Sequence, residues 1–128
     1  MKFDPAPYAD GLRKLNEIEH RRIRDRVQLA HAEASRLAEA IKAADPQVRA
    51  VYLFGSLAEG EPTHLNFDID LALDGGDVYM AMDIASDSTF DVDLVDLHRL
   101  PSHIRDRILQ KGEGLAILKS VLDATKKS

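Results

Sequence analysis

The sequence predicts a single α/β domain of the α+β kind, in which a long N-terminal helix precedes a small mixed β-sheet with helices packed on one face. Three observations support this class. Residues 12–45 contain neither Gly nor Pro and are rich in Ala, Arg, Glu and Leu. Short apolar runs broken by Gly and Asp follow Pro46. A chain of 128 residues with 45% hydrophobic content can also bury one core without disulfides.

The N-terminal helix, within residues 1–46, carries an apolar stripe that alternates steps of four and three residues. Its members are Ile23, Val27, Ala30, Ala34, Leu37, Ile41 and Ala44. Such a stripe is typical of a helix packed on a core. The apolar residues before Ile18 are out of phase with Ile23, and a helix over 11–44 would be roughly 50 Å long, longer than a domain of this size. We therefore expect its first half to kink or project, with Asp4 or Asp10 as the cap and Pro46 as the stop.

The sheet is expected within residues 47–128. Apolar runs bounded by Gly, Pro and Asp predict strands at 48–54, 67–73 and 90–97, with a loop at 59–66 and a short extended piece at 114–118. Helices are expected at 77–86, capped by Asp77, and at 101–111, with Pro101 at the first helical position. The Lys-rich end, 119–128, is expected to fray.

Aspartates gather on one face of the expected sheet. Alternation places Asp68 and Asp70 opposite the apolar side of the second strand, and it places Asp91 and Asp93 likewise in the third. Like charges on one face repel and raise each other's pKa, so a cation is needed to offset them. Carboxylates are the ligands that Mg²⁺ prefers, and a pair can bridge two ions. The candidate metal ligands are Asp68, Asp70 and Asp93, with Asp91 as the alternative to Asp93.

Gly55 and Ser56 end the first expected strand and form the other half of the candidate site. A glycine there lets backbone N–H groups approach a phosphate without a Cβ in the way, and the serine hydroxyl adds a donor. If a helix begins after Ser56, its N-terminus favours the anion further. By itself, this pair is more often a plain turn at a strand end.

Composition excludes several other classes of protein. The net charge of −5 argues against broad binding to nucleic acid or an anionic membrane, and the small number of aromatic residues, seven without any Trp, argues against a base-stacking platform. With no Cys, there is no disulfide framework or thiol nucleophile. No apolar run is long enough to span a bilayer, so we expect a soluble, cytoplasmic protein. The five histidines lack metal-ligand spacing, and Asp74 and Asp96 are expected to be surface or turn residues. The arginines at 21, 22, 24 and 26 are expected on a solvated helix face, with a partner surface as the alternative.

Three segments together resemble the DNA polymerase beta-like nucleotidyltransferase superfamily, in particular the minimal nucleotidyltransferases that pair with HEPN-domain proteins. They are FGSLAEG at 54–60, FDIDLAL at 67–73 and VDLVDL at 92–97, within a similarity that covers 47–118. This resemblance implies a catalytic core in which Asp68 and Asp70 hold two Mg²⁺ ions and Asp93 completes the site near the acceptor hydroxyl. The outgoing phosphates would be held by Gly55 and Ser56.

The resemblance also implies a function. We expect transfer of NMP, with AMP as the favoured group, from ATP or another NTP to a hydroxyl on a HEPN-domain partner, so that the chain acts as an antitoxin. Three features depart from the family pattern: Phe67 where Ser is common, Glu59 where a basic residue is common, and a loop between Ser56 and Asp68 that is one residue longer than usual. The alternatives are a non-catalytic antitoxin that occludes its partner and an antibiotic-type transferase acting on a small molecule. A homo-oligomer formed through the N-terminal helix is a further expectation.

Overall fold

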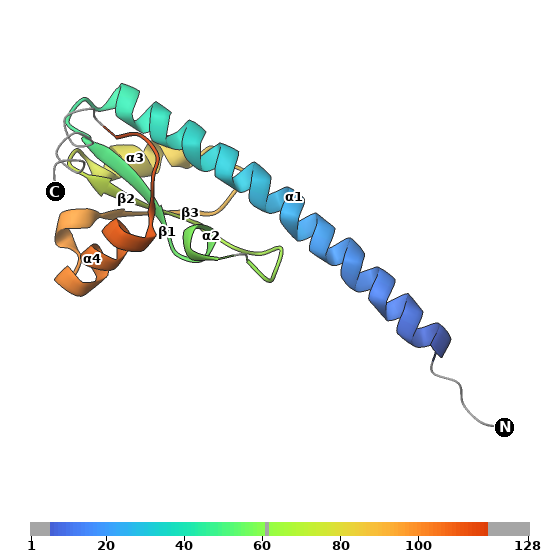
Figure 1. Cartoon of the computed structure of the whole chain (residues 1–128). Coiled ribbons are helices and arrows are strands. Elements are labelled where there is room, and N and C mark those ends of the chain that lie inside the picture. Colours follow the sequence, from blue (N-terminus) through green and yellow to red (C-terminus); the bar gives the residue numbers. More distant parts are fainter. Residues whose placement is uncertain (1–5, 61, 118–128) are drawn as a thin grey trace.

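The computed structural model describes residues 6–60 and 62–117, and its elements follow the expected order (Figure 1). They are α1 (Ala6–Ala44), β1 (Ala50–Phe54), α2 (Ser56–Glu59), β2 (Ile69–Asp74), α3 (Val78–Ala85), β3 (Val92–Asp96), a 3₁₀ turn at Leu97–Arg99, α4 (Ser102–Lys111) and β4 (Glu113–Gly114). The mixed α/β class is confirmed. The expected fraying of 119–128 lies outside the described residues.

The four strands form one mixed sheet in the order β3-β2-β1-β4. β1 runs antiparallel to β2 and β4, whereas β2 and β3 are parallel. Phe54 at the end of β1 is the register partner of Asp70 near the start of β2, and Asp70 is in turn the partner of Asp93. This topology brings the end of β1 and the beginnings of β2 and β3 to the same end of the sheet.

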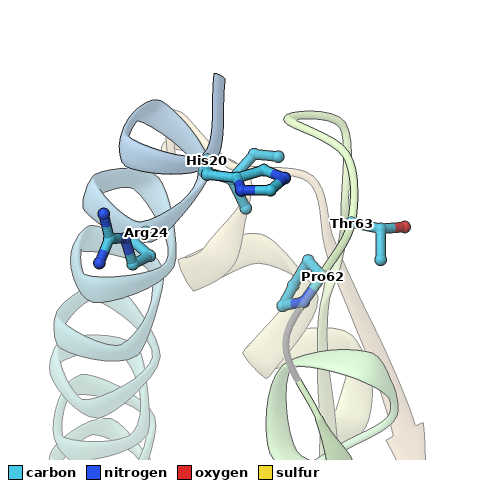
Figure 2. A pocket seen from close by; sticks show the side chains of 5 residues that line it. His20, Arg24, Pro62 and Thr63 are labelled. Carbon is cyan, nitrogen blue, oxygen red and sulfur yellow. The ribbon is translucent and has the colours of Figure 1, made fainter. Parts of the chain in front are cut away.

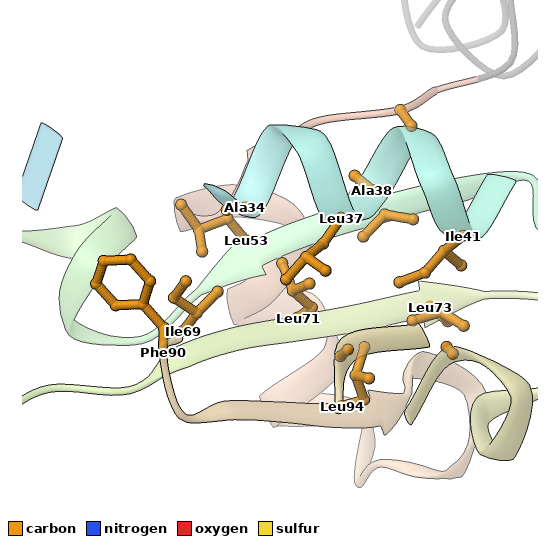
Figure 3. Close-up of a cluster of buried hydrophobic side chains, with 14 of the residues drawn as sticks. Ala34, Leu37, Ala38, Ile41, Leu53, Ile69, Leu71, Leu73, Phe90 and Leu94 are labelled. Atoms are coloured by element: carbon orange, nitrogen blue, oxygen red, sulfur yellow. The ribbon is translucent and has the colours of Figure 1, made fainter. Parts of the chain in front are cut away.

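The second half of α1 packs across one face of the sheet together with α3 (Figures 1 and 3). Five of its side chains are at most 1% exposed: Ala30, Ala34, Leu37 and Ile41 of the apolar stripe, and Ala38 beside it. Ala44, the last member of the expected stripe, is exposed. The buried alanines let the helix axis approach the sheet closely, while Leu37 and Ile41 reach between the strand side chains. Full burial of a Leu or Ile side chain is worth about 1.5–3 kcal/mol, so this stripe is a main source of the domain's stability.

The first half of α1 extends past the sheet as a continuous helix, as Figure 1 shows, so the expected projection is confirmed. Residues 14–22 are all exposed, including Leu15 at 63% and Ile18 at 46%. The first buried side chain that the structure describes in α1 is Ile23. Asp10 lies inside the helix, one turn past its start, so it does not cap it. The alternative cap, Asp4, lies outside the described residues.

The opposite face of the sheet is partly covered by α4, which the sequence analysis had not placed there. Ala72, Leu97 and Ile108 form a second small cluster, with Tyr52 and Phe54 packed against it. This face is therefore closed toward the end of β2. The carboxylates lie at the start of that strand.

The helix and strand ends can be compared with those that local sequence features predict. Asp77 caps α3 as expected, because its side chain accepts from the N–H groups of Tyr79 and Met80. Pro101 is the N-cap of α4 and not its first helical residue. β2 begins at Ile69, so Asp68 lies immediately before the strand. No helix in 6–60 or 62–117 has both the length and the hydropathy needed to cross a membrane.

Candidate active site

The turn after β1 places a glycine directly against a carboxylate. Gly55 has φ of 75°, a conformation that residues with a Cβ rarely adopt, and a Cβ here would overlap the Asp70 side chain. The carbonyl of Gly55 accepts from the N–H groups of Ala58 at 3.1 Å and Glu59 at 2.9 Å, which starts the single helical turn α2 at Ser56. Gly55 therefore allows the turn from β1 into α2 while its backbone lies directly against the Asp70 side chain.

Three carboxylates converge beside this turn. Asp70 is the register partner of Asp93 on the parallel strand, and Asp68 precedes Asp70 by two residues. Burial raises the pKa of Asp70 to about 6, with further contributions from the charges of Asp93 and Asp68 and from a hydrogen bond with Asp93. The strand register pairs Asp70 with Asp93, and the electrostatic effect on Asp70 shows that the charge of Asp68 is also near.

Asp91 occupies a different position from Asp93. It lies one residue before β3, and its carbonyl accepts from the N–H of Ile69 at 2.8 Å. Both aspartates are exposed, so exposure does not separate them. The register places Asp93, and not Asp91, opposite Asp70. The geometry therefore favours Asp93 as the third member of the carboxylate group.

Comparison with known proteins places this arrangement in a family. The family model described as polymerase beta, nucleotidyltransferase matches residues 35–119, from the buried part of α1 past the short β4 strand. The chain belongs to the polymerase beta nucleotidyltransferase family. The match includes the Gly55 turn and all three carboxylates.

One curated protein and two solved structures are similar to this chain. Protein adenylyltransferase MntA from Shewanella oneidensis is 34% identical over 77 residues, and this chain covers 55% of its length. A crystal structure of a toxin–antitoxin with AMP-PNP is 26% identical, with a TM-score of 0.55 over 67% of this chain and 75% of that one. The MntA–HepT toxin–antitoxin structure is 25% identical, with a TM-score of 0.50 over 73% and 74% of the two chains.

The side chains of Asp68, Asp70 and Asp93 are of the chemical type that suits a hard divalent cation. The three carboxylates offer only oxygen ligands, and the pKa of Asp70 is raised first by burial and then by the charges of Asp93 and Asp68. Across 6–60 and 62–117, however, no three His, Cys, Asp or Glu side chains are already arranged around a common point for an ion. Metal binding therefore needs the carboxylates to turn toward a common ion.

An ion pair between Glu59 of α2 and Arg107 of α4 lies next to the Gly55–Ser56 turn. Arg107 of α4 donates through Nε to Oε1 of Glu59 at 3.0 Å, and its Nη2 lies 2.9 Å from the same oxygen. Glu59 is the acidic residue that departs from the nucleotidyltransferase pattern, and Arg107 supplies the opposite charge from a distant part of the chain. The pairing reduces the negative charge that Glu59 adds next to the Gly55–Ser56 turn.

Two charged residues lie in surroundings that differ from those expected. The sequence places Asp74 at the surface or in a turn, but it is the last residue of β2, is only 7% exposed and accepts from Arg49 Nη2 at 3.1 Å. His98 Nε2 lies 2.7 Å from the same carboxylate. The sequence places Arg26 on a solvated face, but its guanidinium lies over the Phe90 ring and its Nε donates to the carbonyl of Leu65 in the loop before Asp68. The available signal was periodicity, since Arg26 follows Ile23 by three residues and adjoins Val27 of the stripe.

Proposed function

We propose that this chain is a Mg²⁺-dependent nucleotidyltransferase that transfers AMP from ATP to a hydroxyl on a HEPN-domain partner protein. The observation that carries the proposal is the register pairing of Asp70 with Asp93 beside the Gly55 turn. Family membership supports the reaction class. The similarity to a protein adenylyltransferase and to toxin–antitoxin complexes, one of them with AMP-PNP, supports the choice of donor and partner.

Each residue of the site has a role in this proposal. Asp68 and Asp70 would hold two Mg²⁺ ions, with Asp93 as a further ligand beside the acceptor. When bound, the ions supply the positive charge that offsets the triphosphate and the leaving pyrophosphate. The backbone N–H groups and the hydroxyl at Gly55 and Ser56 hold the outgoing phosphates.

The reaction is one displacement at the α-phosphorus. The acceptor oxygen forms a bond to phosphorus, the bond from phosphorus to the bridging oxygen breaks, and pyrophosphate leaves with the electron pair. The acceptor hydroxyl gives up its proton, and we assign its removal to Asp93, which lies across the strand register from the metal-holding Asp70.

Labelling with ATP that carries ³²P at the α-phosphorus tests the proposal. In the presence of Mg²⁺ the purified chain should label a co-expressed HEPN-domain partner, and Asp68→Ala should reduce labelling by at least about a hundredfold because it removes a metal ligand. Asp93→Asn should be similarly impaired, whereas Asp91→Asn should stay within about threefold of the original. Full labelling by the Asp68 variant would exclude this site as the place of reaction.

A second function is favoured by the exposed half of α1. Leu15 and Ile18 present apolar surface to solvent beyond the domain, which suits neutralisation of a partner by direct binding. Co-purification separates the two functions. An Asp68→Ala chain that still binds and neutralises the partner without labelling it would support occlusion, whereas loss of neutralisation despite binding would support transfer.

A further inference from the structure

Arg26 of α1 ties down the loop that leads to Asp68. Its Nε donates to the carbonyl oxygen of Leu65 at 3.0 Å. Among the hydrogen bonds formed within the described residues, this is the one that reaches residues 62–68. That segment has no regular secondary structure, and residues 63–66 are exposed. One side chain from another element therefore restrains the approach to a candidate metal ligand.

The loop is poorly supported on the N-terminal side of Arg26. A cavity of about 430 Å³ separates α1 from the loop and is lined by His20, Ile23, Arg24, Pro62 and Thr63. Figure 2 shows the two α1 side chains His20 and Arg24 on one side of this space and Pro62 and Thr63 on the other. Pro62 is buried and Phe67 packs against the core, whereas residues 63–66 between them are exposed, so the hydrogen bond from Arg26 to Leu65 is a contact that holds this exposed part of the loop to α1.

The same guanidinium also contacts the residues that lead into both acidic strands. Its central carbon lies 4.4 Å from the ring centre of Phe90 and 5.9 Å from that of Phe67, and the two rings are 6.4 Å apart. Phe67 directly precedes Asp68, and Phe90 lies three residues before Asp93. Arg26 therefore joins the beginnings of β2 and β3, where the carboxylates must be held at a fixed spacing.

We propose that Arg26 is a positioning residue, which holds Asp68 at the spacing from Asp70 and Asp93 that divalent metal binding requires. The inference rests on the proposed function, because it takes Asp68 as a metal ligand. A guanidinium suits this role, since its planar group can stack on an aromatic ring while an edge N–H donates to a carbonyl. A lysine at 26 keeps the charge but cannot make both contacts with one rigid group.

Binding of Mn²⁺, followed by its electron paramagnetic resonance signal, tests the proposal without relying on activity. Arg26→Ala should weaken Mn²⁺ binding about tenfold, at the lower end of the effects seen when the support of a metal ligand is removed. The Mn²⁺ affinity of Arg26→Lys should fall between that of the original chain and that of Arg26→Ala. Arg22→Ala is the matched control, because it removes the same charge from an exposed position one turn away on α1 and should bind Mn²⁺ like the original chain.

Amide hydrogen exchange supplies a second readout. Arg26→Ala should speed exchange in a peptide covering 62–70 and leave β1 unchanged, since the loop loses its tether while the sheet stays paired. A variant with a lower Tm but unaltered Mn²⁺ affinity would show that Arg26 is only structural and would overturn the proposal. Unaltered exchange together with unaltered Mn²⁺ affinity would overturn it as well.

A parallel titration of Asp68→Ala separates this inference from the proposed function. If Asp68→Ala binds Mn²⁺ as the original chain does, Asp68 is not a metal ligand and the proposed function loses its site. If Asp68→Ala loses Mn²⁺ while Arg26→Ala keeps it, the site stands and the positioning role of Arg26 fails. Loss in both variants, with binding retained by Arg22→Ala, is the result we expect.

Discussion

Replacing Asp70 by Asn should stabilise the metal-free protein at neutral and alkaline pH. The folded chain raises the pKa of Asp70 from 3.8 to about 6, chiefly through burial and then through the charges of Asp93 and Asp68. An acid whose pKa is higher in the folded state binds more protons when folded, so the free energy of unfolding falls as the pH rises between these two values. The penalty is complete above pH 6 and absent below about pH 4. Asparagine has a similar shape and does not ionise, so it avoids the penalty.

The size of the effect follows from the shift. A change of about two pKa units corresponds to roughly 3 kcal/mol at about 1.4 kcal/mol per unit. Asp70 is only half-buried, and solvent screening reduces such effects, so we expect about 1.5 kcal/mol. For a domain of this size that is a rise of roughly 5 °C in Tm. Ionised Asp70 therefore lowers the stability of the metal-free protein. Bound Mg²⁺ should restore this stability in the original chain, whereas it should not add the same stability to the Asn variant.

Urea unfolding in EDTA measures this difference. The chain has no Trp, so far-ultraviolet circular dichroism of its helices is the suitable signal. The gain from Asp70→Asn should be present at pH 8, smaller at pH 5.5 and close to zero at pH 4. Asp87→Asn, at an exposed position after α3, is the control and should change stability by less than about 0.5 kcal/mol at each pH. An Asp70→Asn chain that is less stable than the original at pH 8, or a difference that does not vary with pH, would refute the electrostatic reasoning.

Two further predictions concern the turn. Gly55→Ala should lower the free energy of unfolding by about 1–3 kcal/mol and impair nucleotide transfer, because the positive φ and the overlap with Asp70 disfavour a Cβ. The control is Gly60→Ala, which has open space around it and should change the free energy of unfolding by less than about 0.5 kcal/mol in the same denaturation assay. Arg107→Ala should raise the KM for ATP severalfold, because Glu59 then keeps an unpaired negative charge beside the turn. Adding Glu59→Gln to this variant should restore the original KM. If the double variant stays as impaired as Arg107→Ala, Arg107 acts by another route.

The sequence predicted the acidic face because of a local rule. Period-two alternation places Asp68 and Asp70 on one side of a strand, and aspartate is rare enough in strands that its repetition indicates a function. Alternation could not separate Asp91 from Asp93, since residues two apart share a face. Only the parallel register of β3 against β2, which depends on packing between distant segments, places Asp93 opposite Asp70.

The charged residues that the sequence analysis misjudged all depend on partners far along the chain. Asp74 is buried because Arg49 and His98 reach it, and their sequence separations from it are 25 and 24 residues. Arg26 bonds to Leu65, 39 residues away. The local sequence around such residues predicts only a turn or a basic run. The contacts that order them form only after the sheet has folded, so local patterns cannot predict them. Local signals such as the Asp77 cap need no such contacts, and there the prediction agreed with the structure.

The unbroken course of α1 also gives it the mechanics of a lever. Lys14 lies twelve residues before Arg26, about 18 Å along the helix, and the same rod continues into the core at Ala30 and Leu37. A tilt of about 5° around Ala30, roughly 24 Å from Lys14, would carry Lys14 through roughly 2 Å, so a load on the outer arm acts as a torque on the Arg26 contacts. A protein fused rigidly to that arm would thus strain the loop before Asp68, whereas the same protein on a flexible Gly/Ser linker would leave it at rest.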